Sequence, residues 1–216
     1  MYYKYVIWDI DGTLLNTTEG VVGAVNDTFR KEKLPLLTPL QEKILMGSPK
    51  IQEAFINLYD VDFEQALILA NKYREIYKDK YLLKASEYDG ISDIMTSLVK
   101  HGIIQSIVTN KREDYAITIC RHFNFHKYCS PILGSDGTPK AEKSERILKC
   151  LELLKVSDKK QAVMVGDTLG DKTAAEHAGI DFIGVNYGFG FKNIKGYANS
   201  PIEILDLLRS KKIKVL

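Results

Sequence analysis

The chain has 216 residues, of which 45% are apolar and 27% charged, a balance typical of an ordinary folded protein. Its 30 basic and 28 acidic side chains leave a net charge of +2, so neither a nucleic acid nor a membrane is expected as a partner. The three cysteines make no even disulfide framework, so we expect a reduced cytoplasmic protein. No apolar run reaches the roughly 20 residues that span a bilayer. We expect a monomer or a homodimer.

The first predicted element is a buried strand at residues 5–10, in which an apolar run leads into two aspartates. Residues 16–85 then show no strand-like run, and four stretches within them carry apolar residues at helical spacing. A connection between parallel strands needs only about a dozen residues. A segment this long therefore predicts a separate helical domain, inserted into a core formed by residues 1–15 and 86–216.

The remainder of the chain alternates between predicted strands and helices. Short runs rich in Val and Ile, closed by Gly, Asp or Asn, suit parallel strands that are covered on both faces. Such strands are expected at 103–110, 130–134, 162–167 and 181–186, and amphipathic helices at 91–101, 112–123, 144–155, 171–178 and 201–212. The alternation indicates an α/β fold with a doubly wound, parallel, five-stranded Rossmann-like sheet.

Two aspartates, Asp9 and Asp11, stand at the end of the first strand. Alternation along a strand sends them to the same side, where they would repel each other unless a cation lies between them. All-oxygen ligation favours Mg²⁺. The alternative is a helix cap or an Asx turn, since Asp-Gly is a common turn pair.

The second strand and the third loop offer groups that suit a phosphate. Thr109 and Asn110, at the second strand's end, could hold phosphate oxygens through a hydroxyl and backbone N–H groups, or one of them could cap the next helix. Lys140 and Lys143 follow the third strand, and either could neutralise a phosphate. Both could equally be ordinary surface lysines.

The fourth strand ends in Asp167, and Asp171 follows in the first turn of the next helix. Ligands of open parallel sheets bind beyond the carboxyl ends of the strands, so Asp167 would complete a metal site with Asp9. Asp171 could hold a metal-bound water, or it could simply balance the charge of the helix N-terminus.

These motifs, taken together, resemble a known family. The order DxDGT at Asp9–Thr13, a strand ending in Thr109, a lysine, and GDxxxD at Gly166–Asp171 is similar to the haloacid dehalogenase superfamily of phosphotransferases. The resemblance spans the chain, and it includes the insert at 16–85, which looks like that superfamily's helical cap domain. The segments VTNK, MVGDTLGD and GIDFIGVNYGFG most resemble the phosphoglycolate phosphatase and 5′-nucleotidase-like branch.

The resemblance implies a Mg²⁺-dependent phosphatase that acts on a small phosphorylated metabolite. Asp9 would be the nucleophile that forms an aspartyl-phosphate, and Asp11 the general acid and base, with its backbone carbonyl on Mg²⁺. The residues implied to hold the phosphoryl group or substrate are Gly12, Thr13, Thr109, Asn110, Lys143 and, from the cap, Ser48. The implied Mg²⁺ ligands are Asp9, Asp11, Asp167 and Asp171.

Several alternatives stay open at this point. Lys143 is favoured over Lys140 as the catalytic lysine, because one plain helix and a short turn then lead to the fourth strand. The turn LMGSPK could present Ser48 and Lys50 to the substrate or could merely join two helices. Phosphoglycolate, a nucleoside monophosphate, pyrophosphate and a sugar phosphate all remain possible substrates. A phosphomutase, or a non-catalytic regulatory protein on the same fold, is the alternative function.

Overall fold

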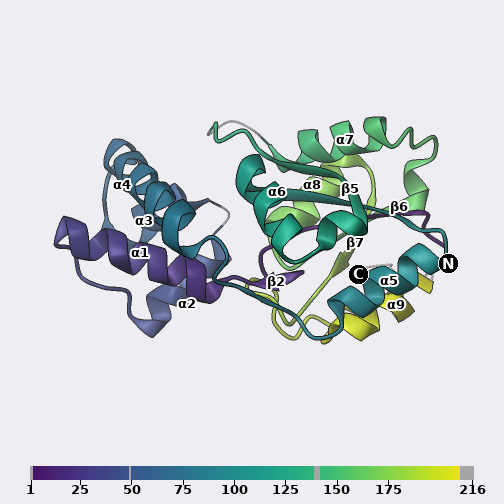
Figure 1. The fold of residues 1–216 in the computed structure, drawn as a ribbon, viewed down its shortest axis with the longest axis horizontal. Helices are drawn as coiled ribbons and strands as arrows, with labels where there is room; N and C mark the ends of the chain where they lie inside the picture. The colour runs from purple at the N-terminus through teal and green to yellow at the C-terminus, as the bar shows by residue number, and fades with distance from the viewer. Residues whose placement is uncertain (1, 49, 139–141, 210–216) are drawn as a thin grey trace. The chain divides into compact units, whose positions relative to one another are not determined.

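The protein is described by a computed structural model that covers residues 2–48, 50–138 and 142–209 and divides into two compact units (Figure 1). The first unit is Met1–Leu15 with Glu87–Leu216, and the second is Asn16–Ser86. No helix among the described residues is both long enough and apolar enough to cross a membrane.

The first unit is built on a parallel five-stranded sheet with the order β5-β4-β1-β6-β7. Its strands are β1 (Tyr5–Trp8), β4 (Ile104–Arg112), β5 (Cys129–Ser135), β6 (Ala162–Gly166) and β7 (Asp181–Gly184). The first strand lies in the middle, and the chain moves outward from it in both directions. This order confirms the predicted α/β fold with a doubly wound sheet.

One strand is longer than the sequence predicts. β1 pairs with β4 only as far as Ile107, whereas β4 continues to Arg112 and pairs there with Ser135 of β5 after a register irregularity. The predicted strand ends at Asn110 and the next helix is predicted from Arg112, whereas residues 109–112 all belong to β4 and extend past the end of β1. This overhang brings Thr109 and its neighbours to the edge where β1 delivers its aspartates.

Helices cover both faces of the sheet (Figure 1). They are α5 (Ile91–Lys100), α6 (Glu113–His122), α7 (Lys143–Leu153), α8 (Leu169–Ala178) and α9 (Pro201–Arg209), with short 3₁₀ turns at Phe125–Lys127 and Lys159–Gln161. Helices α7 and α8 pack against each other beside the strands on one face, and α5 packs against α9 on the other.

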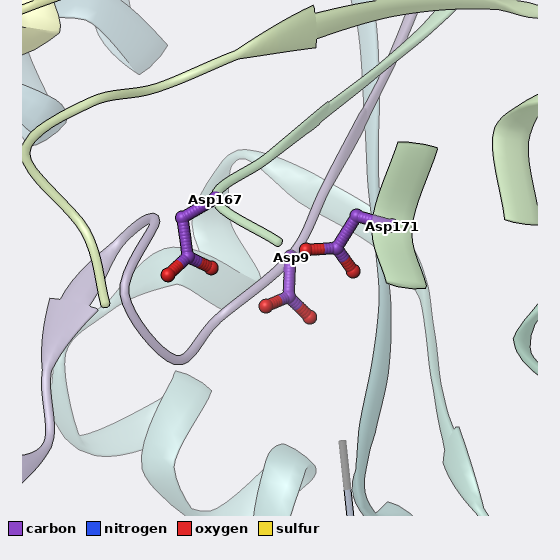
Figure 2. Close-up of side chains that lie close together, drawn as sticks. All are labelled: Asp9, Asp167 and Asp171. Atoms are coloured by element: carbon purple, nitrogen blue, oxygen red, sulfur yellow. The ribbon is translucent and has the colours of Figure 1, made fainter. Parts of the chain in front are cut away.

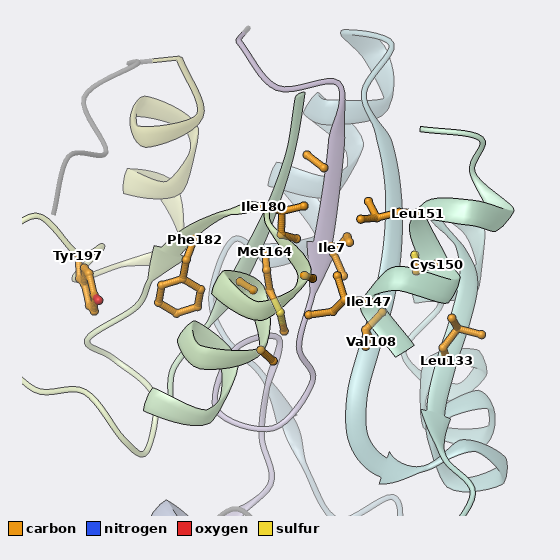
Figure 3. Packing of buried hydrophobic residues seen from close by; sticks show 14 residues of the cluster. Ile7, Val108, Leu133, Ile147, Cys150, Leu151, Met164, Ile180, Phe182 and Tyr197 are labelled. Atoms are coloured by element: carbon orange, nitrogen blue, oxygen red, sulfur yellow. The ribbon is translucent and has the colours of Figure 1, made fainter. Parts of the chain in front are cut away.

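Apolar side chains of the central strands form the core under α7 and α8 (Figure 3). Ile7, Val108 and Met164 come from three adjacent strands and pack with Ile147 and Cys150 of α7. All five are fully buried. Truncating one of the larger side chains to alanine would cost about 2–5 kcal/mol, so this layer holds the strand ends in a fixed arrangement.

The second unit is helical. Its elements are α1 (Thr18–Glu32), α2 (Pro39–Gly47), α3 (Ile51–Tyr59), α4 (Phe63–Ile76) and a π-helical turn at Tyr77–Tyr81. Thr38 begins α2 with a capping box, and the Asp62 side chain caps α4. Buried aromatic rings pack in its interior: Phe29 contacts Phe55 with ring centroids 5.5 Å apart. The predicted small helical insert is therefore present.

Two short strands stand where the chain passes between the units. These are β2 (Leu15–Asn16) and β3 (Ser86–Glu87), which pair with each other. The sequence did not predict them, because two residues are too few to show the alternation of a strand.

Candidate active site

Three buried carboxylates converge at the carboxyl ends of two neighbouring strands. Asp9 directly follows β1, Asp167 directly follows β6, and Asp171 lies in the first turn of α8. Carboxylate oxygens of the three residues lie within 4.8 Å of one another (Figure 2). Because β1 and β6 pair side by side, their ends deliver Asp9 and Asp167 to the same point.

A lysine lies against this cluster. The first residue of α7, Lys143, places its Nζ 2.6 Å from Asp9 Oδ1 and 2.5 Å from Asp171 Oδ1. Only 7% of Lys143 is exposed. A buried ammonium is tolerated only when it is paired, and here it has two carboxylate partners. Lys140, the other lysine considered from the sequence, lies outside the described residues.

Asp171 uses its two oxygens differently. Oδ2 accepts hydrogen bonds from the backbone N–H of Thr168 at 3.0 Å and from its hydroxyl at 2.7 Å, which completes a capping box at the start of α8. Oδ1 faces Lys143. The helix-terminus alternative raised by the sequence therefore accounts for one oxygen, while the other belongs to the acidic cluster.

A loop after β7 holds Asp167 in place. Its Oδ2 accepts hydrogen bonds from the backbone N–H groups of Phe189 at 2.6 Å and Gly190 at 3.3 Å. The turn after β1 packs against the same carboxylate, where a Cβ on Gly12 would meet Asp167 Oδ2 at 2.2 Å. Gly12 also has a φ of +78°, so a glycine is needed there both for space and for backbone conformation.

The environment makes the negative charges unfavourable. Burial, together with the nearby charge of Asp171, raises the pKa of Asp167 to about 7, against the opposing effect of the two backbone N–H groups. Burial likewise raises the pKa of Asp9, against the opposing effect of Lys143. Burial alone would lower the pKa of Lys143, but Asp171 and Asp9 together raise it above its ordinary value. The donors are all carboxylate oxygens, so a hard divalent cation fits this cluster and would stabilise its ionised form.

Asp11 stands apart from the cluster in its contacts. Its Oδ1 lies 3.1 Å from Nζ of Lys111, which is on the overhanging end of β4. This oxygen is buried, and among the described residues it accepts no hydrogen bond. The sequence did not single out the side chain of Lys111, because a lysine in an apparent loop carries no signal of burial.

Thr109 and Asn110 lie on the same overhang. The Thr109 hydroxyl is buried and accepts a hydrogen bond from the backbone N–H of Lys111 at 3.3 Å. Asn110 accepts one at 2.6 Å from Nη2 of Arg146, a residue that the sequence analysis missed. The helix-cap alternative for these two residues is wrong, because β4 continues past them and the N-cap of α6 is Arg112.

The remaining predicted residues are Thr13 and Ser48. Thr13 is fully buried, its carbonyl accepts a hydrogen bond from Tyr187 at 3.0 Å, and its hydroxyl lies 3.5 Å from Asp167 Oδ1. Ser48 belongs to the helical unit, where its hydroxyl donates to the carbonyl of Ile44 at 2.8 Å and ends α2. Its contact with a substrate stays a prediction.

Known proteins resemble this chain in both sequence and structure. Residues 6–185 match the model of a family described as haloacid dehalogenase-like hydrolase. The chain is 32% identical over 192 residues to a 5′-nucleotidase of Pseudomonas aeruginosa, covering 87% of this chain and 85% of that protein. It is 24% identical over 204 residues to a phosphoglycolate phosphatase of Caulobacter vibrioides, covering 93% and 83%. The structure of a "predicted phosphatase" from Clostridium acetobutylicum superimposes with a TM-score of 0.86 at 28% identity, covering 96% of this chain and 99% of that one.

Proposed function

Because the chain belongs to the haloacid dehalogenase-like hydrolase family and is a phosphatase of that family, we propose that it hydrolyses a small phosphorylated metabolite in a Mg²⁺-dependent reaction through an aspartyl-phosphate on Asp9. The observation that carries the proposal is the buried cluster of Asp9, Asp167 and Asp171, with Lys143 in contact with two of them. Burying several carboxylates together lowers the stability of a folded protein, and such clusters of perturbed acids are typical of functional sites.

Mg²⁺ would be held by the carboxylates of Asp9, Asp167 and Asp171, together with the backbone carbonyl of Asp11. The all-oxygen donor set and the raised pKa values of Asp9 and Asp167 support this assignment. When bound, the ion would offset the negative charge that the carboxylates and the phosphoryl group bring together.

Asp9 then attacks the phosphorus atom of the substrate. One of its carboxylate oxygens forms the new bond to phosphorus as the bond to the leaving oxygen breaks. Lys143, which lies 2.6 Å from Asp9, favours the ionised form of the carboxylate and orients it, and it adds a positive charge where negative charge gathers. The leaving oxygen takes the proton of the Asp11 carboxyl group.

The second half of the reaction returns the enzyme to its starting state. The ionised Asp11 accepts a proton from water, the water oxygen bonds to phosphorus, and the bond between phosphorus and Asp9 breaks. Inorganic phosphate leaves. The buried hydroxyl of Thr109 and the N–H groups near Asn110 hold the phosphoryl oxygens throughout, and the turn at Gly12 and Thr13 completes the cradle.

The helical insert, residues 16–85, would act as a cap that excludes water and selects the substrate. Ser48, at the end of α2, is the residue proposed to contact the substrate from this unit. The relatives named above are a 5′-nucleotidase and a phosphoglycolate phosphatase. They support a small phosphate monoester, such as a nucleoside 5′-monophosphate or phosphoglycolate, as the substrate class.

The test is phosphate release from a panel of phosphoglycolate, nucleoside 5′-monophosphates, sugar phosphates and pyrophosphate, with and without Mg²⁺. Asp9→Asn serves as the inactive comparison. Asp206→Asn is its matched control, because it makes the same substitution at an aspartate of α9 whose side chain is 81% exposed. We expect Mg²⁺-dependent release by the wild type and Asp206→Asn alone. Release by Asp9→Asn at the wild-type rate, or none by the wild type from any compound, would overturn the proposal.

A further inference from the structure

Helix α7 presents two buried cations to the strand ends. Lys143 and Arg146 are three residues apart, so they lie on the same face of the helix. Lys143 contacts Asp9, whereas Arg146, only 9% exposed, reaches the β4 overhang and donates from Nη2 to Oδ1 of Asn110 at 2.6 Å. Residues of one helix face therefore contact both the acidic cluster and the residue beside Thr109.

The contact fixes which way the Asn110 amide points. A guanidinium has five donors and no acceptor, so it can bond only to the oxygen of an amide. With that oxygen engaged by Arg146, the two N–H donors of the amide remain for other partners. An unrestrained asparagine could present either end, whereas an ionised phosphoryl oxygen can only accept.

We propose that Arg146 is a positioning residue, which holds the Asn110 amide with its N–H donors available to the phosphoryl group bound beside Asp9. The inference rests on the proposed function, since it deepens the phosphate site of that reaction. Arg146 acts through Asn110, and its contribution depends on a fixed hydrogen-bond direction more than on its charge. A hydrogen bond from a charged donor is stronger than one between neutral groups, so the guanidinium makes such a direction persistent.

Two other roles for a buried arginine make different predictions. An arginine that only stabilises the fold would lower the melting temperature without changing phosphate affinity. An arginine that attracts phosphate by its charge alone would weaken binding whether or not Asn110 is present. Only a positioning role requires the effect of removing Arg146 to vanish once the Asn110 side chain is gone.

The experiment is a double-mutant cycle on Arg146→Met and Asn110→Ala, with inorganic phosphate as the ligand. Its dissociation constant is measured by titration calorimetry in the presence of Mg²⁺, and turnover of p-nitrophenyl phosphate is followed beside it. We expect each single variant to weaken phosphate binding about 10- to 50-fold, as loss of a charge-assisted hydrogen bond does. The double variant should bind within about threefold of Asn110→Ala.

Lys149→Met is the matched control, because it removes a cation from an exposed position of the same helix, and its phosphate affinity should equal the wild type's. Arg146→Lys guards against failure of Arg146→Met to fold. It keeps a cationic donor that can bond only to the oxygen of the Asn110 amide, so its phosphate affinity should be higher than that of Arg146→Met. Melting temperatures establish that each variant is folded.

Phosphate affinity that is unchanged in a folded Arg146→Met variant would overturn the inference. The inference would also be overturned if Arg146→Met weakened phosphate binding equally with and without the Asn110 side chain. A tenfold loss of phosphate affinity in Arg146→Lys that persisted in the Asn110→Ala background would overturn it too. Failure of the proposed function shows separately, as absence of turnover by the wild type, because calorimetry reports phosphate binding without catalysis.

Discussion

Replacing Lys143 with methionine removes the ammonium from the acidic cluster while keeping a side chain of similar length. Nζ of Lys143 lies 2.6 Å from Asp9 and 2.5 Å from Asp171, and all three residues are buried. Removing one partner of a buried ion pair leaves uncompensated charge and costs about 3–5 kcal/mol. For a protein of this size that corresponds to a fall in melting temperature of about 6–20 °C.

The loss should depend on pH in a defined direction. Burial holds the pKa of Asp167 at about 7 and raises that of Asp9, against an ordinary value of 3.8 for both. The folded state therefore binds more protons than the unfolded state across this range, so the free energy of unfolding falls as pH rises from about 4 to 7. Lys143 limits that fall, because it favours the ionised form of Asp9. The variant should accordingly approach the wild type at about pH 5 and differ most at about pH 8.

The assay is thermal unfolding in a chelating buffer at both pH values, with phosphate release in Mg²⁺ measured in parallel. We expect Lys143→Met to lose about 100- to 1,000-fold in kcat/KM, as loss of a preorganised charge at a reacting centre does. Lys140→Met, the matched change at the other lysine considered from the sequence, should keep its activity. A melting temperature at pH 8 within a degree of the wild type's would refute the reasoning, as would loss of turnover in Lys140→Met instead.

Two further predictions concern the metal site. Gly12→Ala should reduce Mg²⁺-dependent phosphate release more than about tenfold, because its Cβ would meet Asp167 Oδ2 at 2.2 Å. Gly137→Ala is the control, since its φ of +87° imposes similar backbone strain with nothing within 4 Å of the Cβ. An equal loss of phosphate release in both variants would exclude a role for the contact with Asp167. Addition of Mg²⁺ should raise the melting temperature more at about pH 8 than at about pH 5, because protons compete for Asp167 at the lower pH. A shift of equal size at both pH values would count against metal binding by this carboxylate.

The sheet could be predicted from the sequence because its strands are covered on both faces. Runs such as 162–166 are then apolar throughout, and their ends are marked by the first polar residues. The meeting of Asp9 with Asp167 followed from the same rule, since parallel strands deliver their carboxyl ends to one edge. These inferences depend on local pattern and on a general property of α/β sheets.

The overhang of β4 and its contacts could not be predicted in this way. The sequence places the end of this strand at Asn110 and the start of the next helix at Arg112, whereas pairing with β5 keeps the chain extended to Arg112. The contacts of Lys111 with Asp11 and of Arg146 with Asn110 depend on that geometry. From sequence alone, a lysine or arginine on a helix or loop is expected to lie at the solvated surface, because most such residues do. Its buried contacts become visible only in the tertiary structure.

The central claim is that the Asp9 carboxylate attacks phosphorus, and the stereochemistry of hydrolysis tests it most directly. A p-nitrophenyl thiophosphate made chiral at phosphorus with oxygen isotopes is hydrolysed with Mg²⁺, and the configuration of the released thiophosphate is determined. Each in-line displacement inverts phosphorus, so attack by Asp9 followed by attack of water predicts net retention. Net inversion would mean that water attacks the substrate directly, and it would contradict the account.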